Sequence, residues 1–273
     1  MSEPEPIGRA HEDPQLLGRI AQAASAADLG AHKSAHPALH PVHRKNIRWL
    51  AIATPVLALV TLVGVLVNGN WWFLTGLLAL GFGLGLVGNV VTARPFYGKD
   101  RGVRLDLYTN GLVYAHGGGL HVVRYDRTSV TASITHHRRN GLTAYRYHLI
   151  DLTGTQFLML GNLANPQSWG PVIQDAVVDA QLAPTWAALE AGQRVQFGDL
   201  WMTGAELGRL DKAIAWERIE RVDIDNGAIA VTLAGKIWPG FTGAVGDIPN
   251  FRLFYTLAEH SIRLRGRDGV NQV

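Results

Sequence analysis

The segment GLGLVG, residues 83–88, has the G-x-G-x-x-G spacing with which a dinucleotide-binding turn holds a pyrophosphate. Asp106 follows where such a fold places the acid that holds a ribose hydroxyl. A Rossmann turn also needs a short strand before it and a long helix after it. Here the glycines lie inside an uncharged apolar stretch, Trp71 to Val91, and Pro95 prevents a long cofactor helix. We therefore reject the nucleotide site and expect Asp106 to be an ordinary strand residue.

The apolar stretch has a neighbour, because Trp49 to Val67 is also free of charge. Each stretch is long enough to cross the roughly 30 Å hydrocarbon core of a bilayer as a helix. Spans at 49–67 and 71–91 predict a transmembrane helical hairpin within residues 47–93. Small residues allow helix backbones to approach closely, so the expected packing positions are Gly81, Gly85 and Gly88.

Charges around the two spans predict their orientation. The flanking basic residues are Arg44, Lys45 and Arg48 before the first span and Arg94, Lys99 and Arg101 after the second. The linker NGN between the spans is uncharged, and positive residues stay on the cytoplasmic side. The first span begins too far along the chain for a signal peptide. We therefore expect a multi-pass protein of the cytoplasmic membrane with both termini in the cytoplasm.

Composition excludes several kinds of chemistry. The 273 residues include no cysteine, so disulfides and thiolate metal sites are excluded. A net charge of +3 is too small to indicate a nucleic-acid partner. No G-x-S-x-G, P-loop or H-E-x-x-H motif is present. The sequence therefore predicts a protein that is not an enzyme and has no cofactor and no metal.

Residues 1–46 are rich in proline, alanine and histidine, and we expect a flexible cytoplasmic segment with one short helix ending at Gly30. Four histidines have the spacing of one helical face and suggest a metal site: His32, His36, His40 and His43. Pro37 and Pro41 interrupt that helix, and no acid or cysteine completes a ligand set. A polar linker is therefore the preferred interpretation.

Beyond the spans, short alternating runs predict strands. Residues 103–160 give about six strands in an antiparallel meander, with Asn110-Gly111 as a hairpin turn at positive φ. An amphipathic helix follows and should end at Pro184, before a further short helix that ends at Gly192. Residues 98–192 are therefore expected to form one domain closed by a helix.

The same plan then repeats over residues 193–265, leaving 266–273 as a tail. Strands around a turn at Asn226-Gly227 lead to a final amphipathic helix, which Asp247 or Asn250 can cap. The segments 125–131 and 216–222 hold an aromatic residue, an acid and an arginine at matching places after a strand. The second domain is short of one or two clear strands, which leaves its closure open.

Strands closed by a single C-terminal helix are similar to pleckstrin-homology-like (PH-like) barrels. From about residue 47 to 263 the chain resembles an uncharacterised family of bacterial membrane proteins with a two-helix anchor and tandem PH-like domains. The resemblance is carried by LDLYTNGLVY (105–114), RYDRTSV (124–130), IAWERIERVDI (214–224) and DIPNF (247–251). It implies an α+β fold, with a transmembrane hairpin followed by two antiparallel PH-like domains, and no established activity.

A basic cluster is the main candidate for ligand binding. His136, His137, Arg138 and Arg139 stand at a predicted hairpin tip, where they can donate to anionic headgroups or phosphates. The alternative is a solvated turn that keeps the hairpin soluble.

The function expected from the sequence is that of a non-catalytic binding or scaffold protein at the cytoplasmic membrane face, with a protein partner or anionic lipid as ligand. The alternative is an accessory or regulatory subunit of a membrane enzyme or transporter, assembled through the helical hairpin. Whether the chain forms a homo-oligomer is left open.

Overall fold

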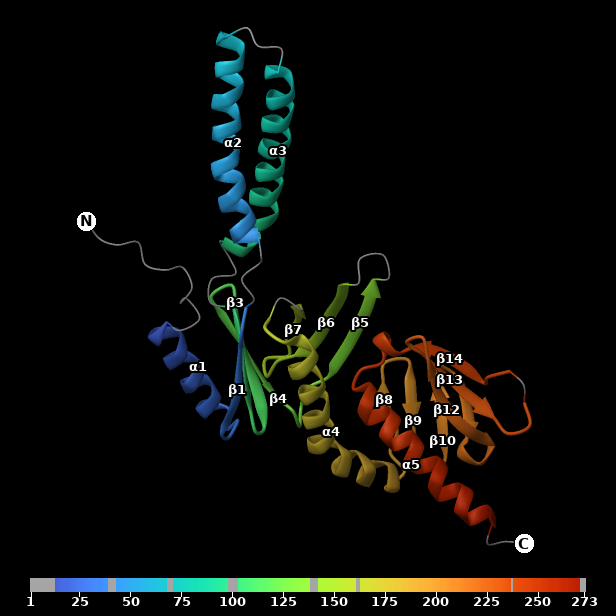
Figure 1. Ribbon diagram of the computed structural model, residues 1–273. Coiled ribbons are helices and arrows are strands. Elements are labelled where there is room, and N and C mark those ends of the chain that lie inside the picture. Colours follow the sequence, from blue (N-terminus) through green and yellow to red (C-terminus); the bar gives the residue numbers. More distant parts are fainter. Residues whose placement is uncertain are drawn as a thin grey trace.

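The computed structural model describes residues 13–38, 43–67, 71–97, 103–137, 142–160, 163–236 and 238–270 of the chain. These residues form an α+β fold of two β-rich units and a pair of long helices (Figure 1). The helix pair extends away from the first unit, and the second unit lies farther from the pair than the first (Figure 1).

Unit 1 contains two antiparallel sheets and one closing helix. The first sheet is four-stranded in the order β1 (His32–Pro37), β2 (Arg104–Tyr108), β3 (Gly111–His116) and β4 (Gly119–Arg124). The second is three-stranded in the order β5 (Val130–His137), β6 (Leu142–Ile150) and β7 (Gln156–Leu160), and α4 (Pro166–Glu190) follows. The core of the unit is built around Tyr147, Trp169 and Tyr125, all buried.

Unit 2 repeats this order of elements. Its four-stranded sheet contains β8 (Val195–Phe197), β9 (Leu200–Met202), β10 (Glu206–Arg209) and β11 (Lys212–Ala215). Its three-stranded sheet contains β12 (Ile219–Asp225), β13 (Ala228–Leu233) and β14 (Phe241–Ala244), and α5 (Phe251–Val270) follows. The separate core contains Trp216 and Phe254. The sequence left the completeness of this second domain open, and the structure gives it the same order of strands as unit 1, with most of them shorter.

The matching joints of the two units have the same geometry. Tyr125 and Trp216 are both buried and both follow the last strand of the four-stranded sheet. The amide of Tyr125 donates to the carbonyl of Asn110 at 3.0 Å, and the amide of Trp216 donates to that of Ala205 at 3.1 Å. Each acceptor lies in the turn between the second and third strands. The internal repeat predicted from the sequence is therefore a repeat in structure.

The N-terminal segment differs from the expected flexible linker. α1 (Pro14–Ala26) begins after Asp13, whose side chain accepts from the amide of Gln15 at 2.9 Å. It packs on the outer face of the first sheet, and β1 pairs with β2 along its whole length. Unit 1 therefore begins before the helix pair and not at residue 98, because its edge strand comes from the N-terminal segment.

The two long helices are inserted between neighbouring strands. α2 (His43–Leu66) and α3 (Trp72–Tyr97) pack side by side and lie in the chain between β1 and β2 (Figure 1). The β1–β2 ladder ends with Pro37 opposite Arg104, and the amide of Ala38 donates to the carbonyl of Val103 at 3.0 Å. Both connections to the helix pair therefore leave from one end of the first sheet.

α4 also differs from expectation, since it continues through Pro184 to Glu190 as one helix. Proline removes one hydrogen bond from a helix and bends it, but packing on both sides can hold the helix together. α4 turns in its last part, where its residues begin to contact unit 2 (Figure 1). The expected pair of helices is therefore one bent helix shared by the two cores.

Candidate functional site

The outer surface of the helix pair is apolar. Exposed leucine, isoleucine, valine, phenylalanine and tryptophan side chains follow both helices, among them Ile52, Leu59, Leu66, Phe73, Leu74, Leu80 and Leu84. Within the described residues one helix, Trp49–Leu66 in α2, is long and apolar enough to cross a membrane, and α3 contains the shorter apolar helix Trp72–Gly88. An exposed apolar surface of this extent marks an interaction site.

Only one of the three glycines expected from the sequence faces the other helix. A Cβ atom at Gly85 would contact Leu50 of α2 at 3.9 Å, whereas one at Gly81 or Gly88 would meet no atom within 4 Å beyond its own stretch of helix. The closest approach is at Gly64, where a Cβ atom would lie 3.0 Å from Trp71. Two further contacts join the helices along their length, since a Cβ atom at Gly76 would lie 3.3 Å from Thr61 and one at Gly83 would lie 3.7 Å from Thr54. A spacing of seven residues keeps both contacts on one face of each helix, and Gly81 lies on another face of α3. A partner helix on that face stays a prediction.

The basic flanks of the helix pair are described only in part. Arg44, Lys45 and Arg48 belong to α2 and Arg94 to α3, but their side chains lie outside the described residues, as do Lys99 and Arg101 entirely. Their role in topology therefore stays a prediction.

The basic tip of the β5–β6 hairpin is also described in part. His136 is exposed near the end of β5, and its Nδ1 lies 3.0 Å from the hydroxyl of Thr143 on β6. His137 is the last residue of β5, and its side chain lies outside the described residues, as do Arg138 and Arg139 entirely. The structure thus places the start of the predicted cluster on a hairpin, as expected, and leaves the headgroup contact a prediction.

Asp106 lies in strand β2, as the sequence predicted, but its burial and its partners were not predicted. Asp106 is only 2% exposed and lies under α1. Arg104 donates to both of its carboxylate oxygens, from Nε at 2.7 Å and from Nη2 at 2.9 Å. His32 Nε2 lies 2.9 Å from the same carboxylate. The cluster therefore ties β1 to β2 and opens onto a pocket of about 470 Å³ beside α1.

A sequence signal for this pair exists, because residues two apart on a strand share a face. The chain repeats the arrangement at Arg124–Asp126 and at Arg221–Asp223, each as an arginine two residues before an aspartate. The partner His32 had no such signal, since it comes from a distant segment.

The metal site that the N-terminal histidines suggested has no ligand set among the described residues. No group of three or more metal-binding side chains there is close enough to hold an ion. The ring of His36 contacts the hydroxyl of Ser34 at 3.1 Å.

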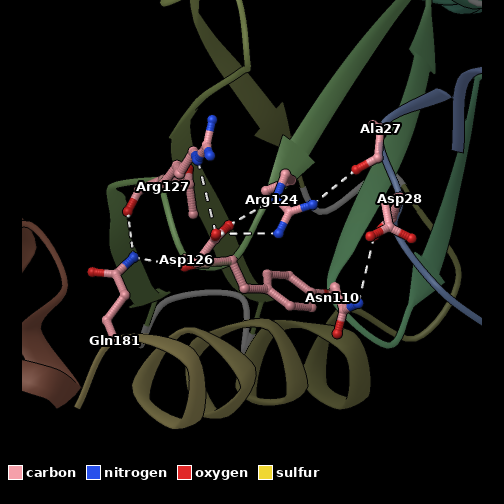
Figure 2. Close-up of polar contacts among 9 residues, drawn as sticks. Ala27, Asp28, Asn110, Arg124, Asp126, Arg127 and Gln181 are labelled. Atoms are coloured by element: carbon pink, nitrogen blue, oxygen red, sulfur yellow. Dashed lines mark hydrogen bonds and ion pairs between the residues drawn. The ribbon is translucent and has the colours of Figure 1, made fainter. Parts of the chain in front are cut away.

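Arg124 attaches the end of α1 to the sheet (Figure 2). Its Nη1 donates to the carbonyl of Ala27 at 3.0 Å, and its Nε donates to Asp126 at 3.0 Å. The hydrogen bond from Arg124 holds the pKa of the Asp126 carboxyl below its usual range. Close by, the amide of Asn110 donates to the carbonyl of Leu29 at 2.9 Å. These contacts fix the N-terminal segment on unit 1.

Asn250 joins the two units. It has a left-handed φ of 50°, which asparagine tolerates better than most residues. Its Oδ1 accepts from the amide of Val130 at 2.7 Å, and its own amide donates to the carbonyl of Val130 at 2.8 Å. Its Nδ2 also donates to Gln181 at 3.0 Å. Gln181, labelled in Figure 2, in turn donates to the carbonyl of Tyr125 at 2.6 Å.

Asp247 or Asn250 was expected to cap α5. Asn250 directly precedes the helix, and its carbonyl accepts from the amide of Phe254 at 3.0 Å, but its side chain bonds to unit 1. The segment that contains it packs along the start of β5 and against α4, and leaves a cavity of only about 30 Å³ there. Arg252 adds an ion pair with Asp175 of α4. The junction is therefore well packed and hydrogen-bonded, which supports a fixed arrangement of the units.

We expect Asn250→Ala to lower the free energy of unfolding by about 2–4 kcal/mol, since the Val130 amide loses its partner and alanine is strained at positive φ. Asn250→Gly keeps the backbone conformation and isolates the loss of the hydrogen bonds. Urea unfolding of the detergent-solubilised chain, followed by tryptophan fluorescence, measures both. Equal stability of all three proteins would contradict the role of Asn250.

Comparison with known proteins identifies the family of the chain but assigns no activity to it. No curated protein and no solved structure matches the chain. Residues 1–265 match a family of unknown function (DUF6585), a range that includes both units and the helix pair. The chain therefore belongs to this family of unknown function.

Proposed function

We propose that the chain is a membrane-anchored, non-catalytic binding or scaffold protein that presents two PH-like domains at the cytoplasmic face of the membrane. The observation that carries the proposal is the apolar outer surface of α2 and α3. That surface is connected at both ends to a β-unit that has its own buried apolar core.

The dimensions of the helix pair support two transmembrane helices. α2 has 24 residues and α3 has 26, so each is at least about 36 Å long at 1.5 Å per residue, against a hydrocarbon core of about 30 Å. Trp49 and Trp72 are exposed near opposite ends of the apolar region, where indole rings favour the membrane interface. The basic flanks support a cytoplasmic position for the two units, because positive residues stay on the cytoplasmic side.

The PH-like assignment rests on the order of elements. In each unit a four-stranded and a three-stranded antiparallel sheet are followed by one helix, whose apolar side chains enter the core between the sheets. This order agrees with the resemblance carried by the sequence. Domains of this kind support many functions, so a binding role rests on the membrane location and on the basic β5–β6 tip. The ligand class proposed is a protein partner or an anionic lipid.

Cysteine labelling tests the anchor and its orientation, because the chain has no cysteine of its own. We expect Asn70→Cys, in the linker between α2 and α3, to react with an impermeant maleimide added outside intact cells. Thr153→Cys, exposed in unit 1, should react only after lysis. Release of the chain from membranes by alkaline carbonate, or the opposite labelling pattern, would overturn the proposal.

A further inference from the structure

One end of unit 1 must lie near the membrane if α2 and α3 cross it. The connectors 38–42 and 98–103 each span at most about 20–25 Å when fully extended, so the end of the sheet at Pro37 and Arg104 is held close to the bilayer. Strands alternate in direction, so the end of β5, the start of β6 and the end of β7 lie at this same end of the unit. The pairing of Ala38 with Leu163, just after β7, confirms this position. Figure 1 shows β5 and β6 rising toward the helix pair.

Apolar side chains are exposed at this end of the second sheet. Ile134 near the tip of β5 is 55% exposed, although it lies on the strand face that carries buried Val130 farther down. Leu160 at the end of β7 is 44% exposed and stands opposite Arg146 of β6. Ile134 and His136 lie on one face of the second sheet, and Arg146 and Leu160 lie on the other face at a similar height along the strands. We call these four exposed residues, which border this end of the sheet on both faces, the membrane rim: Ile134, His136, Arg146 and Leu160.

The charge of the rim complements an anionic surface. No aspartate or glutamate occurs between Asp126 and Asp151, while this segment contains arginines and histidines throughout. The equivalent hairpin of unit 2 differs, since Ile224, near the end of β12 and on the face that carries buried Val222, stands between Asp223 and Asp225. The basic and apolar combination is therefore specific to the unit that is connected to the helix pair.

We propose that the membrane rim of unit 1 lies in the headgroup layer of the same bilayer that holds α2 and α3. The inference rests on the proposed membrane anchor and adds a second contact, which orients both units relative to the membrane. Exposed apolar side chains enter the boundary between headgroups and acyl chains, and basic groups meet anionic headgroups. Unit 2 follows at a greater distance from the surface, because it is fixed to unit 1 through Asn250.

Single cysteines carrying an environment-sensitive fluorophore test the contact in the full chain, reconstituted in nanodiscs of phosphatidylcholine and phosphatidylglycerol. The three variants are Ile134→Cys on the rim, Ile224→Cys near the end of β12 in unit 2, and Leu59→Cys on the apolar surface of α2. We expect blue-shifted emission, quenched by spin-labelled lipids, from positions 59 and 134. The label at position 224, where Ile224 of the parent chain is 48% exposed, should show the red-shifted emission of a fluorophore in water, without quenching by the lipids.

The pattern of quenching at the three positions distinguishes the rim contact from the membrane anchor. Quenching at 59 with a water-like signal at 134 overturns the rim contact and leaves the anchor standing. A water-like signal at 59 overturns the anchor itself. Equal quenching at 134 and 224 also contradicts the proposal, because it would show no preferred orientation. In discs of phosphatidylcholine alone, we expect the quenching at 134 to weaken while that at 59 stays unchanged.

Discussion

A chain in which Asn-Gly replaces residues 39–102 is expected to remain in the soluble fraction and to fold with both β-units intact. The replacement removes α2 and α3 and joins Ala38 directly to Val103 through a two-residue turn. Those two residues are already hydrogen-bonded neighbours, with the amide of Ala38 3.0 Å from the carbonyl of Val103. Asn-Gly is the preferred sequence for a tight turn between antiparallel strands. The parent chain, by contrast, should require detergent.

The matched control for this experiment is the fragment of residues 98–273, which also lacks the helix pair. It additionally loses α1 and β1, and with them Ile20, Ala24 and Leu29, which cover the outer face of the first sheet. β2 then becomes an exposed edge with unpaired backbone groups. We expect this fragment to aggregate, although it contains every strand that the sequence alone predicted for the first domain.

Sedimentation after lysis, circular dichroism and urea unfolding distinguish the two chains. The expected result is a soluble protein with one cooperative unfolding transition for the Asn-Gly variant only. An insoluble Asn-Gly variant together with a soluble, folded 98–273 fragment would show that β1 and α1 are not part of unit 1. A parent chain that is soluble without detergent would contradict the membrane anchor.

The difference between these two chains shows what the sequence could and could not predict. Local features were predictable: the turn at Asn226 and Gly227 has the expected positive φ of 49° and 77°. At Gly111 the position was correct but the reason differed, because a Cβ atom there would lie 2.1 Å from the carbonyl oxygen of Val123. The glycine is needed for close approach of β3 and β4 and not for backbone conformation.

Features that depend on distant residues were not predictable from one sequence. β1 pairs with β2, which comes after the whole helix pair in the chain. The two strands are therefore not separated by the short loop of a hairpin, which is the feature that would have predicted their pairing. The burial of Asp106 depends on α1, which lies still farther away in the chain. Asn250 was identified as a polar residue before a helix, but its partners in unit 1, Gln181 and Val130, are 69 and 120 residues earlier in the chain. Alternation, turns and caps are local, whereas pairing and burial are properties of the assembled fold.

The buried cluster in unit 1 gives the second large expected effect. Asp106→Ala should lower the free energy of unfolding by about 3–5 kcal/mol, because it leaves the guanidinium of Arg104 inside the protein without its carboxylate. The side chains of Asp106 and Arg104 are only 3% and 15% exposed, so water cannot replace the lost partner fully. Asp106→Asn keeps one acceptor oxygen and should cost less. Loss of the His32 contact should also loosen β1 from β2.

Asp223→Ala is the matched control, because Arg221 and Asp223 have the same spacing and a similar contact of 2.8 Å. Both side chains are exposed to solvent, at 58% and 43%, so removing the carboxylate should change stability very little. Urea unfolding measures the three variants, and proteolysis between α1 and β1 should become faster in Asp106→Ala alone. If Asp106→Ala is as stable as Asp223→Ala, the cluster does not hold β1 in place. In that case the attachment of the N-terminal segment would depend on the apolar contacts of α1 and on Arg124.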